Sequence, residues 1–195
     1  MKISLLNAFV VALSLLSVNT AAQAELKLPT IIDSHMVLQR DAPITIWGWD
    51  TAGTSVEVSI AGNSEKAKAG DDGKWAVKLP ALKADGKAHS MTIAGSSTVK
   101  LEDILVGEVW VGSGQSNMEW QLRNTFGSKE AIATAKHPNI RLFHIPKVSK
   151  PKPVDDVNAK WKACTPENVP TFSAVLYYFG RKVHEEIDVP VGLIN

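Results

Sequence analysis

The sequence has one cysteine, no excess of charge and no run of like charges, and each absence excludes a class of protein. Cys164 is the only cysteine among 195 residues, so no internal disulfide framework holds the chain together. The formal net charge is +1, which does not indicate a nucleic-acid footprint. No cluster of His, Cys and carboxylate residues predicts a metal site, so we expect neither a metal nor a cofactor.

The first 24 residues have the pattern of a secretory signal peptide. Lys2 provides a basic start, residues 5–18 form an apolar stretch, and Ala22-Gln23-Ala24 is a small-x-small cleavage site. A membrane anchor is the alternative, but the apolar stretch is short for a span. We therefore expect cleavage after Ala24, a periplasmic or secreted protein, and no membrane partner after cleavage.

Residues 25–100 predict a small all-β sandwich domain. Short segments of alternating apolar and polar residues follow one another about every ten residues, separated by Gly- and Asp-rich turns. The expected strands lie at 44–49, 55–62, 74–80 and 89–95. Trp47, Trp49 and Trp75 are interpreted as core anchors of this sandwich, with a sugar-stacking platform as the alternative.

The pattern changes after Lys100, and residues 101–195 predict parallel βαβ units. A near-continuous apolar run at 104–112 is typical of a strand that is buried on both faces. Further strands are expected at 139–145 and 189–195, and helices at 128–137, with a serine N-cap, and at 172–187. The second helix carries six apolar residues on one face: Phe172, Val175, Leu176, Phe179, Val183 and Ile187.

Two features of this half remain open to a functional or a plain interpretation. The segment from Pro146 to Pro170 is rich in Lys and Pro, and long loops of this kind are often functional, although a surface excursion explains it equally well. Cys164 lies in this segment. We interpret it as a semi-buried thiol rather than a nucleophile, because no helix start follows it.

Residues 110–120, WVGSGQSNMEW, contain the end of the predicted strand. Two glycines follow it, and then Ser116 between the amide residues Gln115 and Asn117. In open α/β sheets, ligands lie beyond the carboxyl ends of the strands, so Ser116 could expose its hydroxyl there. A dinucleotide fingerprint needs glycine where Asn117 stands, and a hydrolase elbow needs it where Met118 stands. The residues alone leave a nucleophilic serine and a plain strand-to-loop turn both open.

This stretch resembles the serine-containing first block of SGNH-type hydrolases, in the Gly-Gln-Ser-Asn-Met form of sialate O-acetylesterases and related carbohydrate acetylesterases. HMVLQRDAPITIWGW (35–49) is similar to the start of the N-terminal β domain of the sialate O-acetylesterase family. NIRLFHIP (139–146) and residues 172–195 resemble the strand and the helix-strand unit that follow it. The resemblance implies a flavodoxin-like SGNH hydrolase domain preceded by a β domain.

The resemblance also implies a reaction, namely ester hydrolysis through an acyl-serine intermediate that releases acetate from an acetylated sugar. Ser116 matches the nucleophile, and its backbone N–H matches one oxyanion donor. Gln115 and Asn117 are implied to lie close to the substrate. The family's other donors, a glycine and an asparagine, and its Asp-x-x-His base belong to later blocks that are absent here.

We therefore expect residues 101–195 to be the N-terminal part of a truncated α/β domain that is inactive by itself. None of the five histidines has the Asp-x-x-His context, and His144 alone is expected near Ser116. The predicted function is sialate O-acetylesterase. An acetylxylan-type carbohydrate esterase and a non-catalytic sugar-binding remnant are the alternatives.

Overall fold

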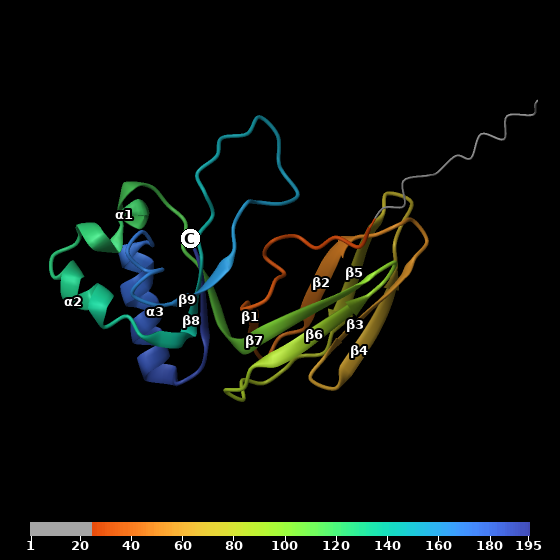
Figure 1. The fold of residues 1–195 in the computed structure, drawn as a ribbon, viewed down its shortest axis with the longest axis horizontal. Coiled ribbons are helices and arrows are strands. Elements are labelled where there is room, and N and C mark those ends of the chain that lie inside the picture. Colours follow the sequence, from red (N-terminus) through yellow and green to blue (C-terminus); the bar gives the residue numbers. More distant parts are fainter. Residues whose placement is uncertain (1–24) are drawn as a thin grey trace, which may run out of the picture.

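One long strand, β7 (Thr98–Val111), runs through both halves of the molecule and joins them (Figure 1). The computed structural model describes residues 25–195, so the predicted signal peptide lies outside the described residues. The other elements are, in chain order, β1 (Val37–Gln39), β2 (Ile44–Trp49), β3 (Ser55–Ile60), β4 (Asn63–Lys68), β5 (Lys74–Leu79), β6 (His89–Ala94), α1 (Ser116–Glu119), a 3-10 turn η1 (Leu122–Asn124), α2 (Ser128–Ala133), β8 (His137–Phe143), β9 (Trp161–Cys164), α3 (Ala174–Ile187) and β10 (Val191–Ile194).

The structure is mixed α/β, with one large sheet and few helices. The sheet has the order β4-β3-β6-β7-β10-β8-β9, with β1 paired to β7, while β2 and β5 form a separate antiparallel pair. Among residues 25–195, no helix is long and apolar enough to cross a membrane.

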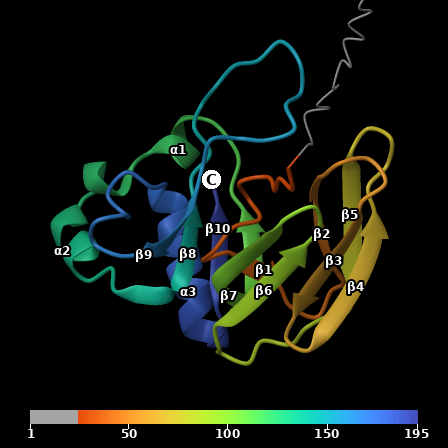
Figure 2. The ribbon, with the colours of Figure 1, turned by 45° about the vertical axis from the view of Figure 1, so that its right-hand side comes forward.

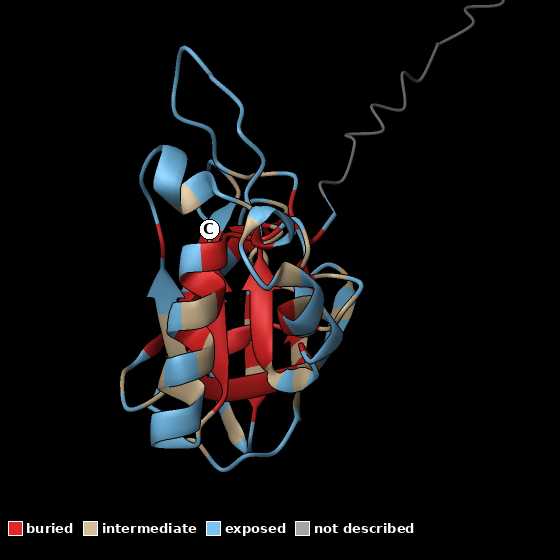
Figure 3. Cartoon of the chain, turned by 90° about the vertical axis from the view of Figure 1, so that its left-hand side faces the viewer, coloured by how far each residue is buried: buried red, intermediate tan, exposed pale blue. Residues whose placement is uncertain are grey.

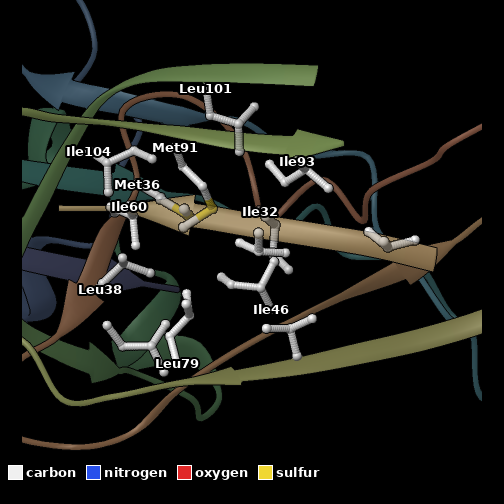
Figure 4. Packing of buried hydrophobic residues seen from close by; sticks show 14 of the residues in the cluster. Ile32, Met36, Leu38, Ile46, Ile60, Leu79, Met91, Ile93, Leu101 and Ile104 are labelled. Carbon is white, nitrogen blue, oxygen red and sulfur yellow. The ribbon is translucent and has the colours of Figure 1, made fainter. Parts of the chain in front are cut away.

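The N-terminal strands form because every second side chain is apolar and faces a shared core. In β2 and β5 the alternation of buried and exposed residues is strict, and in β3 the residues Val56, Val58 and Ile60 are fully buried. Figure 4 shows Ile46 and Leu79 of the β2–β5 pair packing toward Ile60, Met91 and Ile93 of the large sheet. The expected strands at 44–49, 55–62, 74–80 and 89–95 are all present.

Strand β4 was not predicted, because it lacks an apolar alternation. It pairs with β3 through a two-residue turn in which Ala61 and Gly62 both have positive φ values of 49° and 77°. This is the turn geometry that matches the twist of a hairpin. The sequence signal is weak because alanine rarely adopts a positive φ.

In the C-terminal half the predicted parallel arrangement of strands is confirmed. The order of the strands in the sheet decides which of them has an unpaired edge. Strand β10 pairs in parallel with β7 on one side and with β8 on the other. Strand β10 therefore lies inside the sheet and presents no unpaired edge. Its outer neighbour β8 is covered in turn by β9, an unpredicted antiparallel strand within the Lys- and Pro-rich segment.

Helix α3 lies against this sheet, and Figure 3 shows the buried strands behind it. Ser173 caps the helix by accepting a hydrogen bond from the N–H of Leu176. The buried residues of the helix are Ala174, Leu176, Tyr177 and Gly180. Of the six residues predicted to share its apolar face, Val175, Phe179 and Ile187 are exposed. The helix turns a smaller face inward because Gly180 allows it to approach Leu193 of β10 closely.

Helix α2 is shorter than expected and begins differently. It spans 128–133, its N-cap is Gly127 in a left-handed conformation, and Ser128 is its first helical residue without a capping side-chain bond. His137, expected at the end of this helix, begins β8 instead. Pro138 keeps His137 out of the helical region, because the residue before a proline avoids it.

The two halves share one core as well as one strand. Phe143, Trp161 and Ile194 of the C-terminal half belong to the same buried cluster as Ile46, Val56 and Met91 of the N-terminal half. The indole N–H of Trp161 donates to the carbonyl of Ile31 at 2.8 Å. The segment before β2 thus covers the sheet face that α3 leaves open, and the expected boundary near residue 100 falls inside β7.

Candidate active site

The carboxyl ends of the three parallel strands meet at one end of the sheet. The N–H of Gly112, just after β7, donates to the carbonyl of Ile194 at 2.8 Å. The N–H of Asn195 donates to Phe143 at 3.0 Å, and Ile145 donates back to Asn195 at 2.8 Å. Figure 1 places the C-terminus at the same end as α1 and the long loop that follows β8.

Ser116 begins α1 in the connection that follows β7, and its side chain is exposed. Neither its hydroxyl nor its backbone N–H makes a hydrogen bond to another residue within 25–195. Both groups are therefore available to a molecule that enters from solvent. A hydroxyl that attacks and an N–H that receives the developing negative charge are the two groups an acyl transfer needs at one place.

Gly112, four residues before Ser116, is required by packing rather than by a left-handed turn. Gly112 does not have a positive φ. A Cβ atom at Gly112 would lie 2.8 Å from a methyl carbon of Leu176 and 3.2 Å from the sulfur of Met118. Because Gly112 has no side chain, α3 and α1 can pack against the end of β7. This packing places Ser116 at the carboxyl end of the strand.

A cavity of about 830 Å³ lies beside Ser116, and we call it the serine cavity. Its wall combines the three strand ends with α1 and the long loop, residues 144–160. Gln115 and Asn117, both predicted to lie near the substrate, flank Ser116 and are exposed, but they do not line this cavity. The carbonyl of Asn117 instead accepts the N–H of Trp120 at the end of α1.

His144 is the histidine that lines the serine cavity, in the place where the sequence expected one near Ser116. Burial, followed by the positive charges of Lys147 and Lys162, lowers the pKa of His144. The ring is therefore neutral at pH 7. The side-chain amide of Asn195 lies 3.3 Å from Nδ1 of His144, within hydrogen-bond distance. In a triad Nδ1 of the base donates to an orienting carboxylate, and an amide stands in that place here, so His144 is not arranged as the base of a triad.

The other four histidines lie away from the serine cavity, as the sequence analysis expected. His35 contacts Asp103 at 2.7 Å, and His89 contacts Asp85 at 3.1 Å. His184 bonds the carbonyl of Val189 at 2.7 Å at the end of α3. These are structural contacts. Within residues 25–195, no group of three or more His, Cys, Asp or Glu residues is arranged to hold a metal ion.

Cys164 is fully buried at the end of β9, deeper than the semi-buried position that the sequence suggested. Burial raises the pKa of its thiol to about 12, although the charge of Arg181 opposes this shift. A thiol with this pKa carries almost no thiolate at neutral pH, so a nucleophilic role for Cys164 does not fit its environment.

An apolar wall of the serine cavity was missed by the sequence analysis. Trp120, which follows α1, is 54% exposed and lines the cavity, and its indole N–H donates to the carbonyl of Asn124 at 3.2 Å. Ile145 and Val148 of the long loop line the same cavity. An ion pair between Glu119 and Lys147 ties the loop to α1. The tryptophan at the end of the GQSNMEW motif was the available signal for this wall.

Comparison with known proteins first defines a class. No family model matches the chain. Among solved structures, it is similar to a carbohydrate acetylesterase from Xanthomonas citri, with a TM-score of 0.84 and 35% identity. That match covers 88% of this chain and 40% of the other. The chain is thus similar in both fold and sequence to a carbohydrate acetylesterase.

Curated relatives narrow the class to one family. The sialate O-acetylesterase of Mus musculus is 29% identical over 206 residues, which cover 95% of this chain and 38% of that protein. The sialate O-acetylesterase of Homo sapiens is 30% identical over 184 residues, covering 84% and 35%. The resemblance to the sialate O-acetylesterase family is therefore confirmed, and the chain spans well under half the length of these relatives.

Proposed function

We propose that this chain carries the nucleophile-bearing part of an esterase that removes O-acetyl groups from sugars. The single observation that supports the proposal most is the position of Ser116. Its exposed and unbonded hydroxyl stands in a cavity at the carboxyl ends of three parallel strands. We also propose that residues 101–195 are part of a flavodoxin-like SGNH hydrolase domain, and that residues 25–100 form its β domain.

In the proposed reaction, the Ser116 oxygen attacks the carbonyl carbon of the acetyl group. The Ser116 N–H donates to the oxygen that becomes negative, and the sugar leaves as its free hydroxyl with the proton that the serine loses. Water then attacks the acetyl-serine, which releases acetate and restores the hydroxyl. The proton needs a base at each step, and the described arrangement of His144 does not provide one.

For the substrate, we propose an acetylated sialic acid, with an acetylated xylan as the alternative. The names of the two curated relatives support sialic acid, while that of the solved structure supports acetylated carbohydrate in general. The exposed indole of Trp120 supports a sugar ring in either case, because its apolar face can cover the C–H face of a pyranose. Saturation-transfer NMR with the two acetylated sugars on the Ser116→Ala variant would separate these candidates.

The nucleophile can be tested with a fluorophosphonate probe on a complete version of the protein that also carries the general base, followed by mass-spectrometric mapping of the modified residue. We expect labelling of Ser116 and its loss in Ser116→Ala. Ser113 is the matched control, because it is exposed, lines the same cavity and lies three residues earlier. Ser113→Ala should be labelled as the parent is. Labelling that persists in Ser116→Ala would contradict the assignment.

We further propose that the 195-residue chain alone releases acetate no faster than its Ser116→Ala variant. The reason is the base, since an unactivated serine is a weak nucleophile at neutral pH. If the parent is clearly faster than the variant, a base is present within the chain, and His144→Ala would identify it.

Export is also proposed from the pattern of residues 1–24. When the chain is expressed in a bacterium, we expect the mature protein to fractionate with the periplasm or the medium and to begin at Glu25. N-terminal sequencing of the purified protein provides the measurement. A mature protein that retains Met1 to Ala24 would show that the segment is not removed.

A further inference from the structure

The outer face of the β2–β5 pair carries two tryptophans side by side. Ile44 and Ile46 of β2 point into the core, while Trp47 and Trp49 lie on the opposite face. Trp47 is 39% exposed, and Trp49 is half-buried. Residues two apart on a strand are separated by roughly 7 Å, so the two indoles form a continuous apolar strip. The sequence analysis favoured core anchors for all three N-terminal tryptophans, and only Trp75 has that position.

Lysines flank this strip on both sides. Lys27 pairs with Trp49 through two backbone hydrogen bonds of 2.8 and 2.9 Å, and its Nζ lies 5.6 Å from the centre of the Trp49 ring. On the other side, Lys74 of β5 stands opposite Trp49 in the register. Cross-strand partners project from the same face of a sheet, so both ammonium groups border the tryptophan strip. We call Trp47, Trp49, Lys27 and Lys74 the tryptophan face.

A cavity of about 490 Å³ opens at this face. Trp47 and Trp49 line it together with Lys68, and the buried Trp75 forms part of its wall. The indole N–H of Trp75 has no acceptor within residues 25–195. Ala76 stands opposite Trp47 in β5, and its small side chain leaves the Trp47 ring uncovered on that side. The face is therefore shaped to receive a molecule and is not sealed by its own side chains.

The long loop connects this cavity with the serine cavity. Lys147 and Val148 line the serine cavity, while Asp155 lines the tryptophan cavity and lies 3.8 Å from Lys74. Asp156 anchors the loop by accepting two hydrogen bonds of 2.9 Å from Thr30. Val148 and Asp155 are seven positions apart, so their Cα atoms are separated by at most about 25 Å. Figure 2 shows the loop rising between the two halves.

We propose that the tryptophan face is a second carbohydrate site, separate from Ser116, and that it binds a glycan whose sugars carry carboxylates. The C–H faces of two neighbouring sugars lie on Trp47 and Trp49, because indole rings offer a large apolar surface at low entropic cost. The carboxylates lie against Lys27 and Lys74. Two lysines and one aspartate line the cavity, and Lys27 lies beside Trp49, so the charges of this face favour an anionic over a neutral chain. The site holds a polymer while its acetyl groups reach the serine cavity.

The test uses the chain with Ser116→Ala and measures binding of fluorescently labelled glycans by anisotropy. The glycans are polysialic acid and polygalacturonate, both free of acetyl groups, with unsubstituted xylan as the neutral comparison. We expect Trp47→Ala and Trp49→Ala each to weaken binding of an acidic glycan at least tenfold. The matched control is Trp110→Ala, which removes a tryptophan of similar exposure, 43%, from the opposite half of the chain and should bind as the parent does.

Two further variants separate a loss of binding from a loss of folding. Both change exposed lysines, so the fold should not be affected. Lys27→Gln and Lys74→Gln should weaken acidic binding several-fold, and the loss should shrink as salt is raised. Which acidic polymer binds better identifies the source of the carboxylate. Three results would each overturn the proposal: no binding of either acidic glycan, equal binding of xylan, or unchanged binding in Trp47→Ala and Trp49→Ala. Because the glycans lack acetyl groups, these results are independent of whether Ser116 is a nucleophile.

Discussion

At the scale of single residues, the most strongly constrained group outside the serine cavity is the carboxylate of Asp103. It accepts two hydrogen bonds from the guanidinium of Arg141, at 2.7 and 2.9 Å, and one from His35 at 2.7 Å. The Arg141 side chain is only 5% exposed, so the carboxylate compensates a buried charge. Asp103 also has a φ of 54°, which few residue types other than Gly, Asn and Asp adopt readily.

This geometry predicts a loss of stability in acid. The hydrogen bonds from Arg141, more than the contact with His35, hold the pKa of Asp103 below its ordinary value. A carboxyl whose pKa is lower in the folded state stabilises the fold above its unfolded pKa of about 3.9. That contribution is lost as the pH falls through the folded pKa. Urea midpoints measured from pH 7 to pH 2 should therefore fall most steeply below about pH 4.

Substitution of Asp103 by Asn isolates the charge, because Asn also tolerates a positive φ. At pH 7 we expect Asp103→Asn to lower the free energy of unfolding by about 2 kcal/mol, a value reduced for the partial exposure of the carboxylate. The difference from the parent should shrink in acid. Glu102→Gln is the control and should have no measurable effect, since that neighbour is exposed and pairs only with Lys100. An equal loss in both variants would contradict this account.

The residue scale also shows what the sequence could and could not predict about the site. Ser116 was singled out because its neighbours resemble a known block, since the Gly-rich turn alone left a plain strand-to-loop turn open. The structure places this serine at the expected end of the strand, and its role as nucleophile stays a prediction. The contact of Asn195 with His144 was not found, since it joins residues 51 positions apart. Trp120 was part of the quoted motif, but its exposure depends on where α1 stands relative to the long loop.

At the scale of elements, helix α3 depends on a close approach to β10. A Cβ on Gly180 would lie 2.4 Å from one methyl group of Leu193 and 2.7 Å from the other. Leu193 is fully buried, so its side chain has little room to move. Gly180→Ala gains helix propensity of about 1 kcal/mol but pushes the helix away from the sheet at a cost of about 1–3 kcal/mol.

We therefore expect Gly180→Ala to destabilise the chain by about 1 kcal/mol in urea denaturation. Leu193→Val provides the matched background, because it removes the methylene that holds the clashing methyl groups outward. In that background Gly180→Ala should be neutral or stabilising, so the two changes should not be additive. Additive effects would mean that Gly180 acts only through helix propensity.

Elements were predictable to the extent that their signals are local. Strands β2, β3, β5 and β6 alternate clearly, and the sequence located them within two residues of their ends. Strand β4 has a single apolar residue, Ala67, and forms because β3 offers an edge across a tight turn. The apolar stripe of α3 was visible, but which of its sides faces the sheet is decided by Gly180, a residue that carries no hydrophobic signal.

At the scale of the whole molecule, the two halves are joined in ways that no local pattern reveals. Strand β7 pairs with β6 over its first part and with β10 over its last. Strand β1 pairs with the residues between them. The side chain of Gln39 continues this pairing by accepting the N–H of Val109 at 2.9 Å. Arg40 binds Glu108 at 2.7 Å, which accounts for a charged residue inside the apolar run.

The shared core predicts that the halves unfold together. Trp161 is the test position, because it is buried, lies 5.1 Å from the ring of Phe143 and donates to the carbonyl of Ile31. Trp161→Ala should lower the free energy of unfolding by about 3–5 kcal/mol. If the two halves unfold as one cooperative unit, a lower free energy of unfolding affects both of them. Hydrogen exchange should then accelerate equally in β3 and β6 of the N-terminal half and in β8 and β10 of the C-terminal half.

Trp110→Ala is the matched control for this experiment, since that tryptophan is half-exposed and packs edge-on against Phe179 of α3. It should leave exchange in β3 and β6 unchanged. If Trp161→Ala accelerates exchange only in β8 and β10, the halves open independently and the contact of Trp161 with Ile31 carries little energy. If both halves respond together, β7 and the core around Trp161 make the tryptophan face and the serine cavity parts of one rigid body.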